Sequence, residues 1–503
     1  MIRQVMVLLT LAAFLNVLFG CSKTELLSPE AKLHNNEYIT AVIMPDGTEY
    51  VFSSAGGEYV PGLNLVRGVT RSGEQVEVKL EDALYVQVKR VDVGKSLLAT
   101  VGITAGVLLT VAIIVAATKE SCPFVYSWNG AQYVFDAEPL GGAVCEGMKR
   151  TDYSRLEHLK AVDGEYRLLI RNEVEETQYL DGLAILAVDH PAGTDVFPDT
   201  LGNMFVVSEP VSPTRAVDGV GGDLLPFVTT RDSVAWQSHM PALGVEYNGP
   251  WRHELTITFP RPVQTSRARL LLNAGTTLWG SNMVREVLAL RGNQLTAWYD
   301  SIAAGGEAEQ SRMGWMQREE LWMLKLQVET AEGWQQQGFV MWAGPLIIED
   351  RAIALDLTEV EGDSVTIRLN PPFGFWTIDY LAIQYDYAPP VAVSEVPLSS
   401  ATDQYGDDVT INLAATDGSY HVMPEVNDWT EAVFADVLPE PRGQIRSLFL
   451  RSTGYYQIHV ENVESPQQSL LTYIGFTPNG TVKWSVQKYQ EWLRQLVAMQ
   501  DEQ

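Results

Sequence analysis

The sequence predicts a mainly β chain with several domains and one membrane-spanning helix. Short segments in which apolar and polar residues alternate recur along the chain between Gly, Pro, Asn and Asp, the pattern of half-buried strands. Residues 97–117 carry no charge and have the length of a transmembrane helix. The chain has 503 residues, too many for one typical core, and its 46% hydrophobic and 19% charged residues suit a folded protein.

Residues 1–20 predict an export signal. One positive charge, Arg3, precedes an apolar run, Val5–Phe19, that is too short to span a membrane comfortably. The run ends in Leu-Phe-Gly before Cys21, which resembles the lipobox of bacterial lipoproteins, although Phe stands where that motif usually has a small or β-branched residue. The resemblance implies cleavage before Cys21 and a lipid on its thiol. The alternative is an uncleaved anchor in which the cysteine is incidental.

Residues 21–37 predict a polar tether, and residues 38–95 a small β-module. We expect five short strands in the module, at Ile39–Met44, Tyr50–Phe52, Leu65–Thr70, Val76–Leu80 and Leu84–Val88, and apolar residues alternate at period two in the last two. This rhythm resembles SH3-like and Sm-like barrels. We do not extend the resemblance to Sm-type RNA binding, because an exported chain with a formal net charge of −28 lacks the basic surface that nucleic acid requires.

The uncharged segment 97–117 is bracketed by Lys95 and Lys119. As a helix it would be about 31 Å long, which matches the hydrocarbon core of a bilayer. Gly102 and Gly106 form a GxxxG step, which favours close helix packing and a homo-oligomer through this face. The alternative is a buried core helix without a membrane.

The two predicted anchors indicate a bacterial cell envelope location. A lipid on Cys21 would place residues 22–95 outside the cytoplasm, but Lys89, Arg90 and Lys95 against a lone Lys119 oppose that orientation in the inner membrane. Both signals fit the outer membrane, with the module in the periplasm and the large remainder facing outward. The lipoprotein resemblance points the same way, because Ser rather than Asp follows the lipidated cysteine.

Residues 120–250 predict a β-rich domain. Asn129-Gly130 lies between two aromatic segments of period two, a strong hairpin signal. Residues 122–130 and 188–199 resemble segments of uncharacterised bacterial envelope proteins, and that resemblance implies no known activity. Cys122 and Cys145 could form a disulfide in an oxidising compartment, worth about 3 kcal/mol in the chain-entropy model, or remain two buried thiols.

Residues 251–388 predict a β-sandwich domain, and residues 389–503 a β-rich region that ends in a helix. The closing strands of the sandwich are similar to those of jelly-roll and galactose-binding-like domains. Apolar residues from Val284 to Ile302 have helical spacing and predict one helix over the sheet. In the last region we expect strands at Val409–Leu413, Ser447–Leu450 and Gly454–His459, then a helix at Trp484–Met499.

Catalytic and metal motifs are not evident. Residues 150–158, with His158 at their end, combine acid, base and hydroxyl types and make a hydrolase site at 146–158 a hypothesis, against a solvated loop or a helix start. Two acidic groups could hold calcium but lack EF-hand spacing, and the seven His are dispersed. We therefore expect no metal and no other cofactor. The acidic groups are Asp136, Glu138 and Glu146, and Asp403, Asp407, Asp408 and Asp417.

The tryptophans are candidates for flat ligand-binding faces, since aromatic rings can stack on sugars. We name Trp128, Trp279 and Trp376 as ligand-facing, with core packing as the alternative for each. Others in the same region are Trp251, Trp298, Trp315, Trp322 and Trp342. The leading hypothesis is a membrane-anchored envelope lipoprotein that acts as a non-catalytic binding or assembly module for a protein or glycan partner, without nucleic acid. A glycan-binding surface lipoprotein is the alternative, and an envelope hydrolase the third.

Overall fold

The computed structural model divides the chain into two units, Met1–Gly102 and Ile103–Gln503. It describes residues 22–27, 38–44, 49–52, 57–60, 64–70, 75–83, 85–91, 123–241, 247, 249–262, 265–385, 389–435, 439–460 and 464–501. The predictions for the export signal, Cys21, Cys122 and the segment 97–117 with Gly102 and Gly106 lie outside these residues. No helix within the described ranges combines the length and the apolar character that a membrane span needs.

The first unit consists of two antiparallel sheets. One has the order β1-β7-β2-β3 and the other β4-β5-β6, and isolated bridges join Ile39 to Gly57 and Phe52 to Thr70. A short 3-10 helix, η1 (Leu80–Asp82), leads into the last strand. The strands are β1 (Ser22–Leu27), β2 (Tyr38–Ile43), β3 (Glu49–Val51), β4 (Glu58–Val60), β5 (Leu65–Val69), β6 (Gln75–Lys79) and β7 (Tyr85–Val91).

The alternation of apolar residues places the core of this unit. In β6, Val76 and Val78 are buried while their neighbours are exposed, and they pack with Phe52 and Val66. All five expected strands are present, with ends that differ by up to three residues. The tether prediction is wrong for Ser22–Leu27, because this polar segment pairs along its whole length with β7 through backbone hydrogen bonds that need no apolar pattern.

The second unit begins with a β-sandwich whose two sheets enclose an apolar core. The first sheet has the order β25 (Ser400–Asp403), β27 (Trp429–Phe434), β11 (Tyr166–Arg171), β8 (Phe124–Trp128) and β9 (Tyr133–Ala137). The second has the order β10 (Arg150–Arg155), β28 (Gln444–Ile458), β12 (Glu176–Pro191) and β24 (Ser394–Pro397), with β26 (His421–Met423) also on β12. The expected hairpin at Asn129-Gly130 joins β8 to β9.

This sandwich differs from the predicted division into 120–250 and 389–503, because both ranges supply its strands. The longest pairing joins β12 to β28 from Glu176↔Ile458 to Pro191↔Gln444. The middle of β12 is buried on both faces: Leu183 and Ile185 face the sandwich core, whereas Leu186 and Val188 face a separate apolar cluster. Pairing between such distant segments leaves no signal in local periodicity.

A second sandwich is inserted between the two halves of the first. One sheet has the order β15 (Arg215–Asp218), β17 (Leu255–Pro260), β22 (Ser364–Leu369), β19 (Met323–Thr330) and β20 (Gly333–Met341). The other has β16 (Trp236–Gln237), β23 (Trp376–Tyr385), β18 (Arg267–Thr276) and β21 (Glu349–Asp356), and a hairpin of β13 (Asp195–Pro198) and β14 (Met204–Val207) stands apart. The mainly β class is confirmed, and the pairs of sheets are consistent with the predicted β-sandwich domains.

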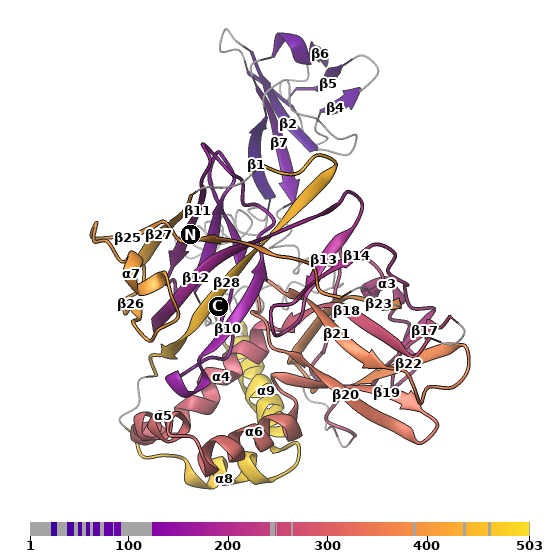
Figure 1. Ribbon diagram of the computed structural model, residues 1–503, viewed down its shortest axis with the longest axis vertical. Coiled ribbons are helices and arrows are strands. Elements are labelled where there is room, and N and C mark those ends of the chain that lie inside the picture. The colour runs from indigo at the N-terminus through magenta and orange to yellow at the C-terminus, as the bar shows by residue number, and fades with distance from the viewer. Residues whose placement is uncertain are drawn as a thin grey trace. The chain divides into compact units, whose positions relative to one another are not determined.

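Five helices of the second unit gather in one lobe beside the sandwiches (Figure 1). They are α4 (Leu278–Ala289), α5 (Leu295–Ala303), α6 (Glu307–Glu319), α8 (Gln468–Phe476) and α9 (Gly480–Asp501). Thr277 caps α4 by accepting a hydrogen bond from the backbone N–H of Gly280 at 2.9 Å. The expected closing helix at Trp484–Met499 is confirmed within α9. The short elements outside the lobe are α3 (Leu225–Val228) and α7 (Thr410–Leu413).

One helix prediction and one strand prediction are wrong. The single helix expected from Val284 to Ile302 is broken between α4 and α5 by η4 (Gly292–Gln294). Gly292 has φ +53°, and a Cβ there would lie 2.3 Å from the backbone oxygen of Glu464, so the break is built into the packing. The strand expected at Val409–Leu413 is instead α7.

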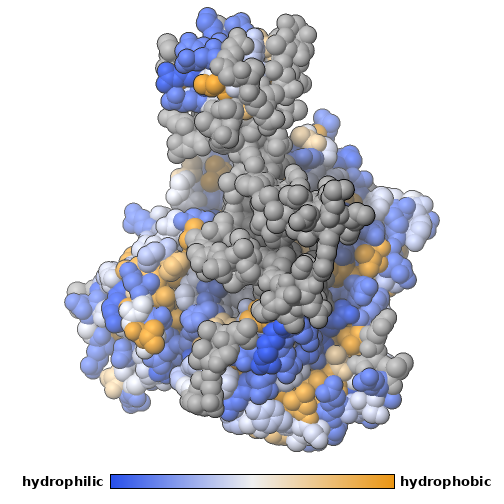
Figure 2. Space-filling view, turned by 180° about the vertical axis from the view of Figure 1, so that it is seen from behind, coloured by the Kyte–Doolittle hydropathy of each residue, from blue (hydrophilic) through white to orange (hydrophobic). Residues whose placement is uncertain are grey.

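The face of the molecule drawn in Figure 2 is mostly hydrophilic. On the face drawn in Figure 2, hydrophobic residues form small separate spots among hydrophilic ones. Among the large apolar side chains that are exposed, Phe476 of α8 is 75% accessible. This side chain lies beside a cavity in the helical lobe.

Candidate functional site

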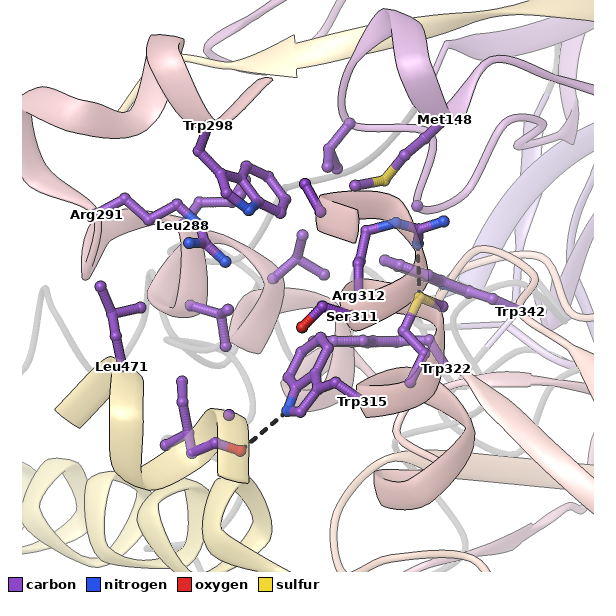
Figure 3. Close-up of a pocket in the computed structure, with 18 of the residues that line it drawn as sticks. Met148, Leu288, Arg291, Trp298, Ser311, Arg312, Trp315, Trp322, Trp342 and Leu471 are labelled. Atoms are coloured by element: carbon purple, nitrogen blue, oxygen red, sulfur yellow. Dashed lines mark hydrogen bonds between the residues drawn. The ribbon is translucent and has the colours of Figure 1, made fainter. Parts of the chain in front are cut away.

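The most distinctive concavity of the second unit is a cavity of about 330 Å³ inside the helical lobe. It lies among α4, α6, α8 and the segment around η3 (Glu146–Met148), and its walls are mostly apolar. Its volume is at the lower end of the range of about 300–1,000 Å³ found for small-molecule sites. Four tryptophans line it, namely Trp298, Trp315, Trp322 and Trp342 (Figure 3).

Helical spacing places the lining residues on the inner face of the lobe. From α4 come Val284, Val287 and Leu288, at steps of three and four residues. From α6 come Trp315 and Met316, one turn after other lining residues of that helix. The sequence therefore forms this wall with the same apolar stripe that it would use to cover a sheet.

The rings are held in place by hydrogen bonds and stacking. The indole N–H of Trp315 donates to the Ile474 backbone oxygen at 3.1 Å and the Thr481 hydroxyl at 3.2 Å. The indole N–H of Trp322 donates to the Gly280 backbone oxygen at 2.9 Å, and its ring stacks on Trp342 with centroids 5.5 Å apart. These restraints preorganise the wall, so a ligand would pay little to order it.

Two arginines line the cavity, and they differ in their partners. Arg312 donates to both carboxylate oxygens of Glu309, at 2.8 and 2.6 Å, and also approaches the sulfur of Met316. Arg291 lies with its guanidinium 3.8 Å from the ring centroid of Trp298. Within the described parts of the chain no carboxylate pairs with Arg291, and its Nε is buried without an acceptor. Burial lowers the pKa of Arg291 to about 10.

A second hollow of about 350 Å³ adjoins the cavity. The two share Arg291, Trp298, Leu471 and Phe476 in their walls. Arg291 and Trp298 are half-buried, whereas Trp322 and Trp342 are buried. The cavity therefore has an open end at Arg291 and a closed end at the stacked tryptophans.

Two of the three tryptophans predicted to face a ligand are core residues, so that prediction is wrong for them. Trp376 is fully buried and donates to the Glu320 backbone oxygen at 3.0 Å. Trp279 is 8% exposed, donates to the Ser485 hydroxyl at 2.8 Å and packs on the rings of two α9 residues. Trp128 is half-buried, edge-on to Tyr133 at 5.1 Å. A strand or helix position does not reveal which rings the packing leaves free.

The lining arginines were missed by the sequence analysis. Arg291 ends the apolar run Leu288-Ala289-Leu290 and precedes Gly292, so a charge at a helix break was the available signal. Nothing in the sequence shows that its carboxylate partner would be lacking, because that depends on packing from α5 and α8.

The cysteine prediction stays open. Cys145 is a buried free thiol, and burial raises its pKa to about 11. The other predicted member of the disulfide, Cys122, is outside the described residues.

The hydrolase candidate 146–158 consists of η3, then strand β10, then a loop. Residues 150–155 are therefore a strand rather than the solvated loop or helix start that we considered as the alternative. His158 Nδ1 lies 2.8 Å from Asp136 Oδ1, and Asp136 also accepts the backbone N–H groups of Glu157 and His158 at 3.0 Å each. The Ser154 hydroxyl is buried and donates to Glu349 at 2.6 Å. The geometry thus engages this serine with a carboxylate of β21 rather than with the histidine.

The acidic groups considered for calcium also have structural partners. Glu138 accepts the backbone N–H groups of Leu346 and Ile347 at 3.0 and 3.3 Å. Asp403 accepts two N–H groups of its own turn at 2.9 Å, and Asp408 accepts the N–H of Thr410 at 3.0 Å. In the part of the chain that the structure describes, no three His, Cys, Asp or Glu side chains gather as a metal site.

Comparisons with known proteins leave the chain without a family. It matches no protein-family model and no curated protein. One solved structure that it resembles is described as BuGH86wt in complex with neoagarooctaose, at 8% identity. The match covers 48% of this chain and 34% of that chain, with a TM-score of 0.17, which is too low to indicate a shared fold.

Proposed function

We propose that this protein is a membrane-anchored envelope lipoprotein whose second unit is a non-catalytic binding module. The observation that carries the binding role is the preformed tryptophan-lined cavity with an arginine that lacks a carboxylate. The anchoring is supported by the sequence, through the lipobox-like ending at Cys21 and the uncharged segment 97–117.

The absence of a reactive arrangement at the cavity favours binding over catalysis. Its lining residues, among those that the structure describes, include no Asp, Glu, His or Cys. They supply rings, aliphatic and thioether side chains, the Ser311 hydroxyl and two guanidiniums, of which Arg312 is already neutralised by Glu309. Proton transfer needs a titratable acid or base near the bound molecule, and arginine holds its proton under physiological conditions. The lining therefore suits recognition of a mostly apolar molecule.

We assign the first unit to the SH3-like class as part of the same proposal. Its two bridged sheets and the 3-10 turn before β7 support this assignment. The sandwiches of the second unit fit the jelly-roll or galactose-binding-like class. Such β-modules commonly serve as docking platforms, which suits assembly at an envelope.

Glycan binding is the second candidate, and Trp128 is the observation in its favour. This half-buried ring lies at the end of β8, beside Tyr133 at the hairpin. A paired indole and phenol of this kind can stack on a sugar. The candidate is weakened because Trp279 and Trp376, the other rings named for it, are buried.

The binding role can be tested by filling the cavity. Ala308 of α6 lines it and is half-buried, so Ala308→Trp should occupy the space and reduce binding of the neutral dye Nile red at least tenfold. Gln310→Trp introduces the same ring on the same helix at an exposed position outside the cavity and should leave dye binding unchanged. Equal dye binding by the native chain and Ala308→Trp would remove the cavity as a binding site.

The anchoring is tested separately. Metabolic labelling with palmitate should mark the native chain and not the Cys21→Ala variant. A native chain that takes no label and fractionates with soluble proteins would contradict the anchor, whatever the cavity binds.

A further inference from the structure

We propose that the cavity of the helical lobe binds an amphiphile with one hydrocarbon chain and an anionic headgroup, which Arg291 pairs. This inference rests on the proposed binding role of the second unit and names the chemical class of its ligand. The headgroup would lie at the open end, between α4 and α8, and the chain would extend toward Trp322 and Trp342.

The first argument is the unpaired charge of Arg291. A guanidinium removed from water is stabilised in proteins by a carboxylate or by several carbonyl oxygens. Arg252, also half-buried, has both: the backbone oxygens of Arg318, Glu319 and Asn370, and the Glu320 carboxylate at 3.4 Å. Among the described residues, Arg291 has the face of Trp298 and no carboxylate. An anionic ligand would supply the missing acceptor.

Desolvation supports this argument. Burial lowers the pKa of Arg291, which means that its charged form is poorly compensated in the free protein. The buried Nε without an acceptor shows the same deficit in hydrogen-bond terms. A carboxylate or phosphate oxygen can satisfy Nε and a terminal nitrogen together, in the fork geometry that arginine favours.

The second argument is the shape and chemistry of the remaining wall. Beyond Arg291 the cavity is bounded by Met148, Val287, Trp315 and the stacked pair Trp322 and Trp342. Figure 3 shows Arg291 and Leu471 on one side and Trp342 on the other, with mostly apolar side chains between them, together with Ser311 and Arg312 of α6. A sugar would leave many hydroxyls without partners there, whereas a hydrocarbon chain needs none.

Arg312 distinguishes the anion site from a general affinity for charge. It lines the same cavity, but Glu309 holds it in a two-point ion pair, so its charge is already neutralised. Only Arg291 can attract an anion without displacing a carboxylate of the protein. This fixes the orientation, with the headgroup at the end that opens to the second hollow.

The test uses the full-length chain in nanodiscs of zwitterionic lipid, titrated by calorimetry with octanoate, decanoate and dodecanoate, and corrected with empty nanodiscs. Each added methylene that the cavity buries should tighten binding about fourfold, until the cavity is full. Decanoate should bind at least tenfold more tightly than decanol, which has the same chain and no charge. Decyl phosphate distinguishes a phosphate headgroup from a carboxylate, and tighter binding of either supports the proposal.

Variants assign the anion to Arg291. Arg291→Gln should weaken decanoate binding about 10- to 100-fold and leave decanol unchanged, while Arg291→Lys should restore part of the loss. Arg285→Gln is the matched control, because it removes the same charge from α4 outside the cavity and should change neither. A terminally brominated decanoate should quench tryptophan fluorescence in the native chain and less in Trp322→Phe.

Two outcomes separate the ligand class from the binding role. If decanol binds as tightly as decanoate and Arg291→Gln changes nothing, the anionic class is wrong while the cavity still binds apolar molecules. If no probe binds, including Nile red, the binding role itself fails and takes this inference with it.

Discussion

Two regions of the second unit bury arginines, and they treat the charge differently. Where the sandwiches meet, Arg155 of β10 donates to Asp350 of β21 at 3.1 Å and to Asp195 of β13 at 2.6 Å. Arg231 pairs with the same two carboxylates. In the helical lobe, Arg291 meets an indole ring and no carboxylate among the described residues.

The difference separates structural charge from charge kept for a ligand. Burial alone would raise the pKa of Asp195, but the nearby Arg155 and Arg231 outweigh it and hold that pKa below its ordinary value. For Arg231 the order is the same: burial would lower its pKa, and Asp350 and Asp195 raise it. The arginines and carboxylates of this network pair with one another within the protein. Arg291 would gain an anionic partner only from a bound ligand.

The largest expected effect comes from breaking the complete network. Asp350 is buried and accepts from Arg155, Arg231 and Asn273, the last at 2.9 Å. Asp350→Ala should lower the free energy of unfolding by about 3–5 kcal/mol, because it removes the more deeply buried of the two carboxylates that Arg155 and Arg231 share. Urea denaturation followed by circular dichroism measures this loss.

The control for that experiment is Glu361→Ala, which removes an exposed acid of the same sandwich. It should change the unfolding free energy by less than about 0.5 kcal/mol. A loss no larger for Asp350→Ala than for this control would mean that the network contributes little, and the contrast with Arg291 would have no energetic basis.

The sequence predicted local elements better than the regions where they meet. Period two located the strands at Leu255, Ile257 and Phe259 and at Val365, Ile367 and Leu369, because each alternation is written in neighbouring residues. The pairing of β12 with β28 was not predictable, since it joins residues more than 250 positions apart by backbone bonds that any side chain permits. The segmentation of the second unit therefore failed although several of its strands were found.

For the candidate site, too, local sequence identified residue types but not the non-local packing around them. Tryptophans could be named as ligand faces from composition, but burial by neighbouring helices decides which rings are free. The pair Trp279 and Ser485, far apart in sequence, shows why Trp279 belongs to the core. Arg291 is the opposite case. In the sequence it is an ordinary arginine at the end of a helix, and the packing of α8 and Trp298 identifies it as a candidate binding residue.

A histidine pair offers a second test of how the fold treats buried positive charge, through the pH dependence of its stability. The rings of His239 and His253 lie 4.3 Å apart, and burial, then the neighbouring His239, lowers the pKa of His253 to about 4. A buried histidine that lacks a paired carboxylate can lose its proton and become neutral, whereas arginine stays charged. Asp218 is the one carboxylate whose charge opposes the shift at both rings.

The sign of the pH effect follows from the lowered pKa. Unfolded histidine titrates near about 6.5, so between that pH and about 4 the unfolded chain binds the extra proton. The stabilisation is complete above the unfolded pKa and is lost as pH falls, by about 1–2 kcal/mol after allowance for partial solvent exposure. His253→Gln should show a smaller loss than the native chain between pH about 7 and about 5 in urea denaturation.

The native chain must be compared with His253→Gln because Asp379 changes the stability with pH in the direction opposite to the histidines. Burial raises the pKa of Asp379 to about 6, so its folded form holds a proton and gains stability as pH falls. This contribution is the same in both chains and cancels in the difference. Identical pH slopes for the native chain and His253→Gln would contradict the assignment.

The smallest expected effect is the one that most directly tests the unpaired arginine. Arg291→Met removes a contact with the Trp298 ring, worth about 0.5–2 kcal/mol, and also removes the uncompensated burial of a guanidinium. The two changes oppose each other, so the unfolding free energy without ligand should change by less than about 1 kcal/mol. Arg155→Met, with both of its carboxylates left behind, should cost several times more. Decanoate should then raise the melting temperature of the native chain more than that of Arg291→Met, since the stabilisation by a ligand increases with the logarithm of its concentration relative to its dissociation constant. A large loss in Arg291→Met without ligand would show that Arg291 supports the fold itself, and the distinction between the two regions would disappear.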